Sequence, residues 1–377
     1  MDPKDDRRIV LTLDAGGTNF RFSAICGNQP VTDTFLLPSS GDDLDQCLSN
    51  IVEGLTRVRK QCPVMPVAIS FAFPGPADYP KGIIGDLGNL PSFRGGVALG
   101  PMLEDLFGVP TFINNDGDLF AYGEAISGFL PYVNGLLQNA GSPKRYKNLM
   151  GITLGTGFGG GIVIDGTLLS GDNSISGEVW LLRNKLCPGM NAEEGASIRA
   201  VRRVYARQAG IPFDEAPEPK EICEIGLGKL PGHRSAALDA FRQLGEVAGD
   251  AMANALTLVD GLGVIGGGIS AAWPLFLPTL TSELNSAYTA PDGHEVRRLA
   301  SMAFNLEDPV QTEKFLAGET RRIKVPGSRK EISYDPCQRI GIGISRLGTS
   351  EAVAIGAYAY ALNKLDQTSG RPVGRPR

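Results

Sequence analysis

The side chains best suited to chemistry follow short apolar runs, in stretches rich in glycine. The first stretch runs from Asp14 to Thr18 and includes Gly16 and Gly17, and the apolar residues 9–13 precede it. Adjacent glycines allow a tight turn and bring backbone N–H groups close to an anion. Asp14 stands where the apolar run ends, so its carboxylate could hold a metal ion or its waters. The pattern predicts a phosphate-binding hairpin, although an ordinary turn uses the same residue types.

The same design occurs again later in the chain. Apolar residues 149–154 run into Gly155, Thr156 and Gly157, after which residues 159–164 lead back out. A third stretch, between two long helical patterns, has three consecutive glycines: Gly266, Gly267 and Gly268. One glycine-rich turn is a weak signal, whereas two halves that each turn a hairpin toward a common cleft are what a nucleotide clamp requires.

Another candidate site follows residues 111–113, where three polar side chains end an apolar run. These are Asn114, Asn115 and Asp116, and a helical pattern begins directly after them. Aspartate is among the preferred helix N-caps, so the pattern predicts Asp116 as the cap of this helix.

The segments between these sites alternate in hydrophobic period between strand and helix. In residues 42–60 apolar side chains recur every three or four positions, which is a helical spacing. The strand patterns 9–13 and 67–73 lie before and after this segment. A strand, a crossover helix and another strand make a parallel pair, so the first hundred residues predict an α/β lobe. The other expected elements are strands at 20–25, 31–36 and 149–154, and helices at 101–107, 236–256 and 351–362.

Composition limits the class of protein. At 377 residues the chain suits two domains, and its 42% hydrophobic and 20% charged residues are typical of a soluble globular protein. A net charge of −5 argues against a broad nucleic-acid-binding surface. Six scattered cysteines without a C-x-x-C pair, no apolar signal core and no membrane-length apolar run together predict a cytoplasmic protein.

Taken in order, the motifs resemble those of the ROK family of sugar kinases, within the actin/hexokinase-like ATPase superfamily. DAGGTNFR resembles the family's first phosphate motif, LGTGFGGGIV its second, and IGGGIS the motif beside the adenosine. FPGPAD, GNLPSF and INNDGDLFAYGE resemble segments around the sugar, and SRLGTSEAVAIGAYA resembles the closing helix. The resemblance runs from Ile9 to Leu362, and its specificity comes from the ordered set rather than from any one motif.

The resemblance implies an α/β, two-lobed actin/hexokinase-like (ribonuclease H-like) ATPase fold with an interlobe cleft. The N-terminal lobe is expected at 1–125 plus 350–366, and the C-terminal lobe at 126–349. Within the latter, the charged region at about 294–339 is expected to be a surface insertion of unassigned role. Residues 367–377 are expected to be a disordered basic tail.

The implied activity is ATP-dependent phosphorylation of a hexose or hexosamine hydroxyl. Asp116 matches the general base, which takes the proton from the attacking hydroxyl. Asn115 matches a sugar-binding side chain, Gly75 and Asn89 are expected on the sugar side, and Asp14 is expected near Mg²⁺. The resemblance assigns the ATP phosphates to Gly16, Gly17, Thr18, Gly155, Thr156 and Gly157, and the adenosine to Gly266, Gly267 and Gly268.

The chain departs from the family where a zinc loop is usual. The family commonly shows G-E-x-G-H before a cysteine-rich loop that ends in a glutamate. Here Glu178 is kept, Leu181 stands in place of the histidine, and Cys187 is the one cysteine of the following segment. Four-coordinate zinc needs four ligands, so we predict no structural zinc.

Two residues near this departure stay open between interpretations. The second sugar-contacting glutamate is Glu193 or Glu194, which the spacing does not settle, and Glu194 is preferred. Trp180 suits either stacking on a sugar face or a buried aromatic, and burial is preferred. Glucose is the first expected substrate, while N-acetylated hexosamines, mannose and fructose stay open because a missing histidine changes which hydroxyls the site can pair.

Two other functions compete with the kinase. The family includes transcriptional repressors with a DNA-binding domain before the kinase-like body, whereas only eight residues precede the first expected strand here. A sugar sensor without catalysis would not need to retain Asp116. The repeated Gly-Arg-Pro of 369–377 resembles minor-groove hooks, but a disordered basic tail is the preferred interpretation. The expected partners are a small sugar and a second copy in a homodimer, with no membrane.

Overall fold

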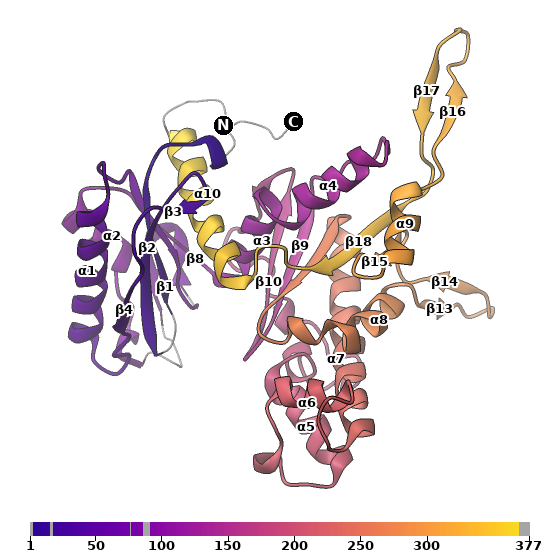
Figure 1. Ribbon diagram of the computed structural model, residues 1–377, viewed down its shortest axis with the longest axis horizontal. Coiled ribbons are helices and arrows are strands. Elements are labelled where there is room, and N and C mark those ends of the chain that lie inside the picture. Colours follow the sequence, from indigo (N-terminus) through magenta and orange to yellow (C-terminus); the bar gives the residue numbers. More distant parts are fainter. Residues whose placement is uncertain (1–2, 16–17, 76, 86–90, 369–377) are drawn as a thin grey trace. The chain divides into compact units, whose positions relative to one another are not determined.

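The computed structural model describes residues 3–15, 18–75, 77–85 and 91–368 (Figure 1). The chain divides into two compact units. Unit 1 comprises Met1–Ser127, Gly166–Ser176 and Leu347–Arg377, and unit 2 comprises Gly128–Asp165 and Gly177–Arg346. The segment Gly166–Ser176 thus groups with unit 1, whereas the sequence placed it in the C-terminal lobe.

Unit 1 is built on a mixed sheet with the order β3-β2-β1-β5-β8, and β4 pairs with β2. Strands β1, β5 and β8 are parallel, and β2 is antiparallel to β1. The bounds are β1 (Val10–Ala15), β2 (Asn19–Cys26), β3 (Gln29–Pro30), β4 (Phe35–Pro38), β5 (Ala68–Ala72) and β8 (Thr111–Asn114). The single strand expected at 31–36 is wrong. Thr32 contacts β2 through its side chain rather than its backbone: its hydroxyl accepts the Ala24 N–H at 3.0 Å.

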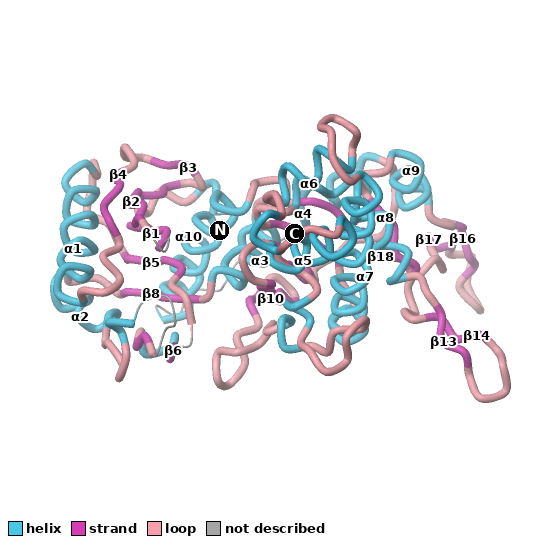
Figure 2. Tube along the Cα trace, turned by 90° about the horizontal axis from the view of Figure 1, so that it is seen from below, coloured by secondary structure: helices cyan, strands magenta, loops and turns pink. Residues whose placement is uncertain are grey.

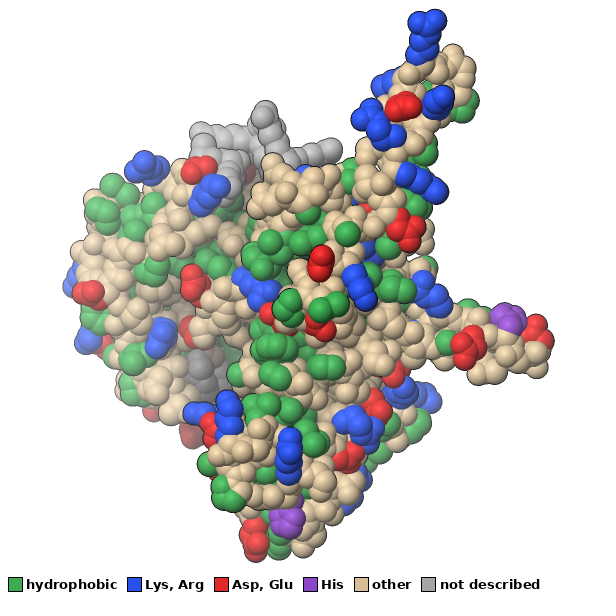
Figure 3. Space-filling view, turned by 45° about the vertical axis from the view of Figure 1, so that its right-hand side comes forward, with side chains coloured by type: hydrophobic (Ala, Val, Ile, Leu, Met, Phe, Trp, Pro, Cys, Tyr) green, Lys and Arg blue, Asp and Glu red, His purple; other side chains and the backbone are tan. Residues whose placement is uncertain are grey.

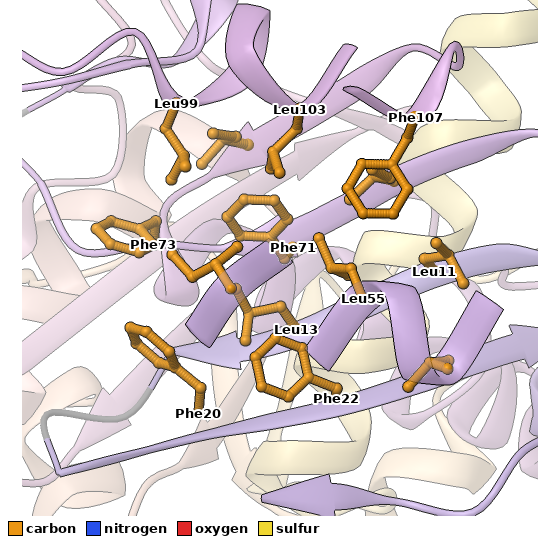
Figure 4. Packing of buried hydrophobic residues seen from close by; sticks show 14 of the residues in the cluster. Leu11, Leu13, Phe20, Phe22, Leu55, Phe71, Phe73, Leu99, Leu103 and Phe107 are labelled. Atoms are coloured by element: carbon orange, nitrogen blue, oxygen red, sulfur yellow. The ribbon is translucent and has the colours of Figure 1, made fainter. Parts of the chain in front are cut away.

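Alternate side chains of these strands lie on opposite faces of the sheet, and each face packs against different helices. Leu11 and Leu13 pack in one cluster with Leu55 and Leu103, whereas Val10 packs on the opposite face with Tyr358. The first cluster is rich in phenylalanine, and its rings interlock between the sheet and its helices (Figure 4). The helices of unit 1 are α1 (Leu44–Gln61), α2 (Leu99–Phe107), α3 (Asp116–Ile126) and α10 (Thr349–Thr368).

Helices α3 and α10 cross with their backbones in direct contact. A Cβ on Gly123 would overlap the Ala352 carbonyl, and a Cβ on Gly356 would overlap the Leu119 carbonyl. The small side chains seen in the sequence of the last helix therefore serve close packing. Helix α10 continues to Thr368, so the expected start of the tail at 367 is wrong, and residues 369–377 lie outside the described residues.

Unit 2 is built on a second sheet with the order β10-β9-β12-β18-β15. All of its strands are parallel except β10, which forms an antiparallel hairpin with β9. The strands are β9 (Leu149–Leu154), β10 (Phe158–Ile164), β12 (Leu262–Gly266), β15 (Met302–Asn305) and β18 (Arg339–Ile344). The helices are α4 (Phe129–Asn139), α5 (Ile198–Ala209), α6 (Pro219–Gly226), α7 (Arg234–Val259), α8 (Trp273–Leu284) and α9 (Pro309–Ala317).

The region expected to be a surface insertion, 294–339, is partly core. Strand β15 pairs with β18 in the central sheet of unit 2, and helix α9 packs Phe315 into the interior. Two hairpins project from the same side of the unit (Figures 1 and 2). They are β13 (Ala287–Thr289) with β14 (Glu295–Arg297), and β16 (Arg321–Lys324) with β17 (Glu331–Tyr334). The region 294–339 therefore holds the sheet strand β15, helix α9 and the whole β16–β17 arm, but only the second strand of the β13–β14 arm.

The remaining elements are short. They are η1 (Pro3–Asp5), β6 (Ala77–Asp78), η2 (Tyr79–Lys81), β7 (Ile83–Ile84), η3 (Pro91–Phe93), β11 (Thr167–Leu168), η4 (Val179–Leu181), η5 (Ala192–Glu194), η6 (Phe213–Glu215) and η7 (Ser270–Ala272). Across the described part of the chain, every helix is too short or too polar to span a lipid bilayer.

Candidate active site

The carboxyl edge of the sheet in unit 1 collects the acidic candidates. Asp14 lies opposite Ala72 in the β1–β5 ladder, and Ala72 lies opposite Asn114 in the β5–β8 ladder. The row places Asp14 two strand spacings, about 10 Å, from Asn114. Asp116 follows Asn114 by two residues at the same edge. Ligands of open α/β sheets bind outside the carboxyl ends of the strands, so this edge is a natural site.

The helix after β8 is capped by Asn115 rather than by Asp116. Asn115 has an extended backbone, and its Oδ1 accepts the Gly117 N–H at 2.8 Å. The predicted cap was therefore wrong, and Asp116 is the first residue of α3. Asp116 Oδ1 also accepts the Gly117 N–H at 2.8 Å, and the residue is exposed at the sheet edge.

The electrostatics of this edge favour a proton acceptor. Desolvation by surrounding protein atoms raises the pKa of Asp116, the Gly117 N–H opposes that shift, and the negative charge of Asp14 adds to it. Desolvation likewise raises the pKa of Asp14, while the Arg21 guanidinium opposes it. Two carboxylates of raised pKa at one edge are typical of a catalytic site rather than of a structural ion pair.

Asp14 fits a magnesium ligand. Its exposed carboxylate makes no hydrogen bond or ion pair within the described residues, and Arg21 lies opposite it in the β1–β2 ladder. Mg²⁺ keeps several waters and takes one or two carboxylates together with substrate phosphates. Among the described residues, no three acidic, histidine or cysteine side chains lie close enough together to hold a metal ion by themselves.

The other candidates of unit 1 are placed only in part. Gly75 is exposed three residues after the end of β5, with the Tyr79 hydroxyl 3.1 Å from the position of a Cβ. Thr18 is exposed at the start of the returning strand, and its carbonyl accepts the Ser39 N–H at 3.0 Å. Gly16, Gly17 and Asn89 lie outside the described residues.

Unit 2 brings its two glycine stretches side by side at the carboxyl edge of its own sheet. Gly266 lies opposite Thr153 in the β12–β9 ladder. Gly267 has φ +89°, and a Cβ there would overlap the Leu154 backbone just before Gly155. Only glycine permits both the positive φ and this approach.

The turn between β9 and β10 is held from both sides. The Gly155 N–H donates to the Gly157 carbonyl at 3.0 Å, and the Ile198 N–H at the start of α5 donates to the Gly155 carbonyl at 2.8 Å. Thr156 is exposed at the tip. No atom lies within 4 Å of a Cβ built on Gly155 or on Gly268. The space beside both glycines is therefore open to a ligand, while the N–H and the carbonyl of Gly155 already have partners.

A network of acidic and basic groups adjoins this turn. Glu193 Oε2 accepts the Phe158 N–H at 3.0 Å, and Arg199 joins Glu193 at 2.6 Å to Glu194 at 2.7 Å. Arg203 binds the other oxygen of Glu194 at 2.6 Å. These arginines hold the pKa of Glu194 below its usual range. Sequence analysis did not identify either arginine, although their spacing of four on the first turns of a helix is a detectable signal.

The segment where the family usually binds zinc is held by hydrogen bonds. The buried Asn184 side chain accepts the N–H groups of Leu186 and Cys187, each at 3.0 Å, and Cys187 is exposed. One exposed thiol does not fit a four-ligand site, and the absence of zinc stays a prediction. Glu178 accepts the Trp180 indole N–H, and Trp180 is half-buried rather than buried.

Comparison with known proteins settles the family. The model of the ROK family matches residues 10–307. This chain belongs to the ROK family. The predicted resemblance is therefore confirmed over most of the chain.

Named relatives agree with this assignment. A glucokinase structure from Parabacteroides distasonis is 55% identical, with a TM-score of 0.88 over 96% of this chain and 99% of that one. An N-acetyl-D-glucosamine kinase from Photobacterium profundum is 30% identical over 276 residues, which are 68% of this chain and 83% of that protein. A ROK glucokinase from Streptomyces griseus, solved with glucose and AMPPNP, shares the fold at 19% identity and a TM-score of 0.57, over 94% of this chain and 98% of that one. The predicted two-lobed α/β fold of the actin/hexokinase type is confirmed.

Proposed function

We propose that this chain transfers the γ-phosphate of ATP to a hydroxyl of a hexose or hexosamine, with Asp116 as the general base. The chain is a sugar kinase, since it belongs to the ROK family and its named relatives are a glucokinase and an N-acetyl-D-glucosamine kinase. The observation that supports the role of Asp116 is its exposed carboxylate of raised pKa at the sheet edge that also carries Asp14.

Asp116 would accept the proton of the attacking hydroxyl. A carboxylate is a better base when its pKa is raised, provided that it stays ionised at the working pH. Phosphoryl transfer otherwise depends on positioning and on neutralising charge. Asp14 would hold Mg²⁺ or its waters, and the ion supplies the charge that neutralises the phosphates.

The glycine stretches would bind the nucleotide. The exposed Thr156 hydroxyl and the open space beside Gly155 suit phosphate oxygens. Gly157, Gly16, Gly17 and Thr18 are assigned to the phosphates by the family resemblance. Gly266, Gly267 and Gly268 would form the floor for the adenosine. The open space beside Gly268 supports this role.

Sugar contacts are proposed for Gly75, Asn89, Asn115, Glu178 and Glu194. The Asn115 Oδ1 is engaged in the helix cap, so its amide nitrogen is the group that would meet a hydroxyl. Both oxygens of Glu194 accept from arginines, whereas Glu193 reaches the backbone of the β9–β10 turn. The choice between Glu193 and Glu194 is therefore tested with both substitutions.

The named relatives order the candidate sugars. The 55% identical relative is a glucokinase and the 30% identical relative acts on N-acetyl-D-glucosamine, so glucose is proposed first and N-acetylglucosamine second. Mannose and fructose complete the panel because a hydroxyl-pairing pocket discriminates strongly among such isomers.

A coupled assay of ADP release over this sugar panel tests the proposal. We expect glucose to give the highest kcat/KM and Asp116→Asn to lose turnover while it still binds the sugar in calorimetry. If no sugar raises ADP release above background although calorimetry detects binding, the chain is a sensor rather than a kinase. Near-normal turnover of Asp116→Asn would remove Asp116 from the mechanism.

A further inference from the structure

Two basic side chains of helix α5 have no assigned role in the proposed reaction, although they belong to the network beside the β9–β10 turn. They are Arg199 and Arg203, one helical turn apart, and their side chains are 39% and 44% exposed. Both bind glutamates of the segment just before the helix. The two arginines differ in what their glutamate partners hold.

The start of α5 holds both ends of the β9–β10 turn. The Ile198 N–H donates to the Gly155 carbonyl at 2.8 Å, directly after the end of β9. At the other end, Glu193 Oε2 accepts the Phe158 N–H at 3.0 Å, where β10 begins. A Cβ on Gly157 would lie 2.8 Å from the same Glu193 oxygen, so this carboxylate lies against the turn. The geometry of the turn therefore depends on where Glu193 is held.

The Glu193 carboxylate is fixed by Arg199. Arg199 Nη2 donates to Glu193 Oε1 at 2.6 Å, which leaves Oε2 for the Phe158 N–H. The same guanidinium donates from Nε and Nη2 to Glu194 Oε1 at 3.0 and 2.7 Å, so a second carboxylate holds Arg199. The Glu193 backbone is fixed as well, because its carbonyl accepts the buried Ser197 hydroxyl at 2.8 Å. A planar guanidinium with several donors is suited to bridging two carboxylates in this way.

Arg203 provides a contrast within the same helix. Its hydrogen bonds within the described residues go to Glu194, one to Oε2 at 2.6 Å and one to the carbonyl at 3.5 Å. The two arginines have the same charge, similar exposure and the same helix. The hydrogen bonds of Arg199, however, include the glutamate that binds the turn.

The charges of this cluster balance, because two arginines face two glutamates. Figure 3 shows the same mixture over the helical end of unit 2, where Lys and Arg side chains lie beside Asp and Glu side chains. An unpaired carboxylate would repel a triphosphate at the neighbouring turn. Partly exposed ion pairs contribute little to folding stability, which favours a role in the geometry of the turn over a role in folding.

We propose that Arg199 is a positioning residue for the turn between β9 and β10, and that it acts through the Glu193 carboxylate. Arg199 holds one oxygen of Glu193, and the other oxygen holds the Phe158 N–H. The turn thereby keeps the geometry in which Thr156 meets the phosphates. The inference rests on the proposed nucleotide role of this turn, and it assigns no contact between Arg199 and a substrate.

Calorimetry of the full chain with AMPPNP and Mg²⁺, without sugar, tests the role of Arg199. Arg199→Met should raise the dissociation constant of AMPPNP by about fivefold or more. Arg203→Met is the matched control, because it removes an equal charge from the same helix, and it should change that constant by less than about twofold. Arg199→Lys keeps the charge but loses the planar group that bridges two carboxylates, so its affinity should fall between those of the natural chain and Arg199→Met.

A double substitution tests whether Arg199 acts through Glu193. Glu193→Ala should weaken AMPPNP binding as Arg199→Met does, and the double variant should match either single variant within about twofold. Hydrogen exchange gives a readout that needs no nucleotide. The peptide that contains the Phe158 amide should exchange faster in Arg199→Met but not in Arg203→Met, while all variants unfold at similar temperatures.

The possible failures of the two proposals are distinct. A natural chain that does not bind AMPPNP overturns the proposed function and, with it, this role of Arg199. If the natural chain binds AMPPNP and Arg199→Met binds it equally well, the proposed function stands and the positioning role is wrong. Equal weakening in Arg199→Met and Arg203→Met would indicate a general effect of charge and also overturns the positioning role.

Discussion

Asp116 and the residue before it share one backbone donor, because Asn115 Oδ1 and Asp116 Oδ1 each accept the Gly117 N–H at 2.8 Å. Asn115 takes the helix cap, so the neighbouring aspartate is exposed at the sheet edge while it still sits on a rigid helix start. Desolvation raises the pKa of Asp116, two backbone N–H groups (of Gly117 and of Asp116 itself) lower it, and the like charge of Asp14 raises it. The Gly117 N–H therefore acts on both the position and the pKa of Asp116.

Asp116→Asn should lower kcat by about 10²-fold or more, because a general base contributes that much or more. Its pKa is raised in the fold above the ordinary 3.8, so the charged form costs stability at neutral pH, and that cost disappears as the pH falls below the unfolded pKa. The neutral variant should therefore unfold at a slightly higher temperature at pH 7. For the natural enzyme, the acid limb of kcat/KM should lie above the range of an ordinary aspartate. A less stable variant, or an acid limb near 3.8, contradicts the assignment.

Glu194→Gln should lower stability at neutral pH by about 1 kcal/mol or less, since the pairs with Arg199 and Arg203 are partly exposed. The pKa of Glu194 is depressed in the fold, so this stabilisation is present above the ordinary 4.5 and is lost as the pH falls through the folded pKa. Thermal unfolding at neutral and at acid pH measures the difference. Glu193→Gln is the comparison: the glutamate whose substitution raises KM for the sugar without changing KM for ATP is the sugar ligand.

At the scale of the element, the two glycine stretches of unit 2 differ in what they require of the backbone. Gly267 has a positive φ and lies against Leu154, which sets the spacing between the β12 end and the β9–β10 turn. Gly268 has neither constraint, and its space is open. A glycine needed for packing and a glycine left open for a ligand therefore stand next to each other.

Gly267→Ala should destabilise the protein by about 1–3 kcal/mol, because the substitution strains φ and forces the strand ends apart. Gly268→Ala is the matched control and should change stability by no more than about 0.5 kcal/mol. If the adenosine lies over Gly268, its substitution should instead raise KM for ATP. Urea unfolding and steady-state kinetics on both variants separate the two effects. Equal losses of stability in the two variants would show that the close approach of Gly267 to the Leu154 backbone does not affect stability.

At the scale of the whole molecule, each unit has its own sheet and its own chemistry. Unit 1 carries the carboxylates at its sheet edge, and unit 2 carries the glycine turns and the glutamates. The arms of unit 2 add a third surface that neither sheet edge uses. The predicted metal use is Mg²⁺ near Asp14 and no structural zinc, and Cys187 is an exposed thiol.

EDTA should therefore abolish turnover, and Mg²⁺ alone should restore it completely. The unfolding temperature should change little on chelation, because hydrogen bonds to Asn184 hold the segment that a zinc ion would otherwise organise. Both statements are checked by measuring activity and the unfolding temperature after dialysis against chelator and again after Mg²⁺ is added back. Elemental analysis of the purified protein identifies any bound metal. A need for added zinc, or a large drop in unfolding temperature, contradicts them.

Much of the fold was predictable because its signals are local. The apolar runs of β1, β5, β9 and β12 end in glycines or acids, and the period of α1 and α7 is visible within one helix length. The predictions failed where a distant or competing group decided the outcome. Thr32 interrupts an expected strand by bonding Ala24, and Asn115 displaces Asp116 from the cap.

The sequence by itself determined the order of the glycine motifs, the family and the candidate base, since each is encoded in a few consecutive residues. Tertiary structure alone decided that Arg199 joins Glu193 to Glu194, and that Glu193 reaches Phe158. It also decided that the charged region 294–339 contributes β15 to the sheet and the β16–β17 arm, which the Arg339–Asp335 ion pair anchors. The physical reason is that a side chain's partner depends on which distant segments of the chain come into contact. The local hydrophobic period and the secondary-structure propensity do not encode such contacts.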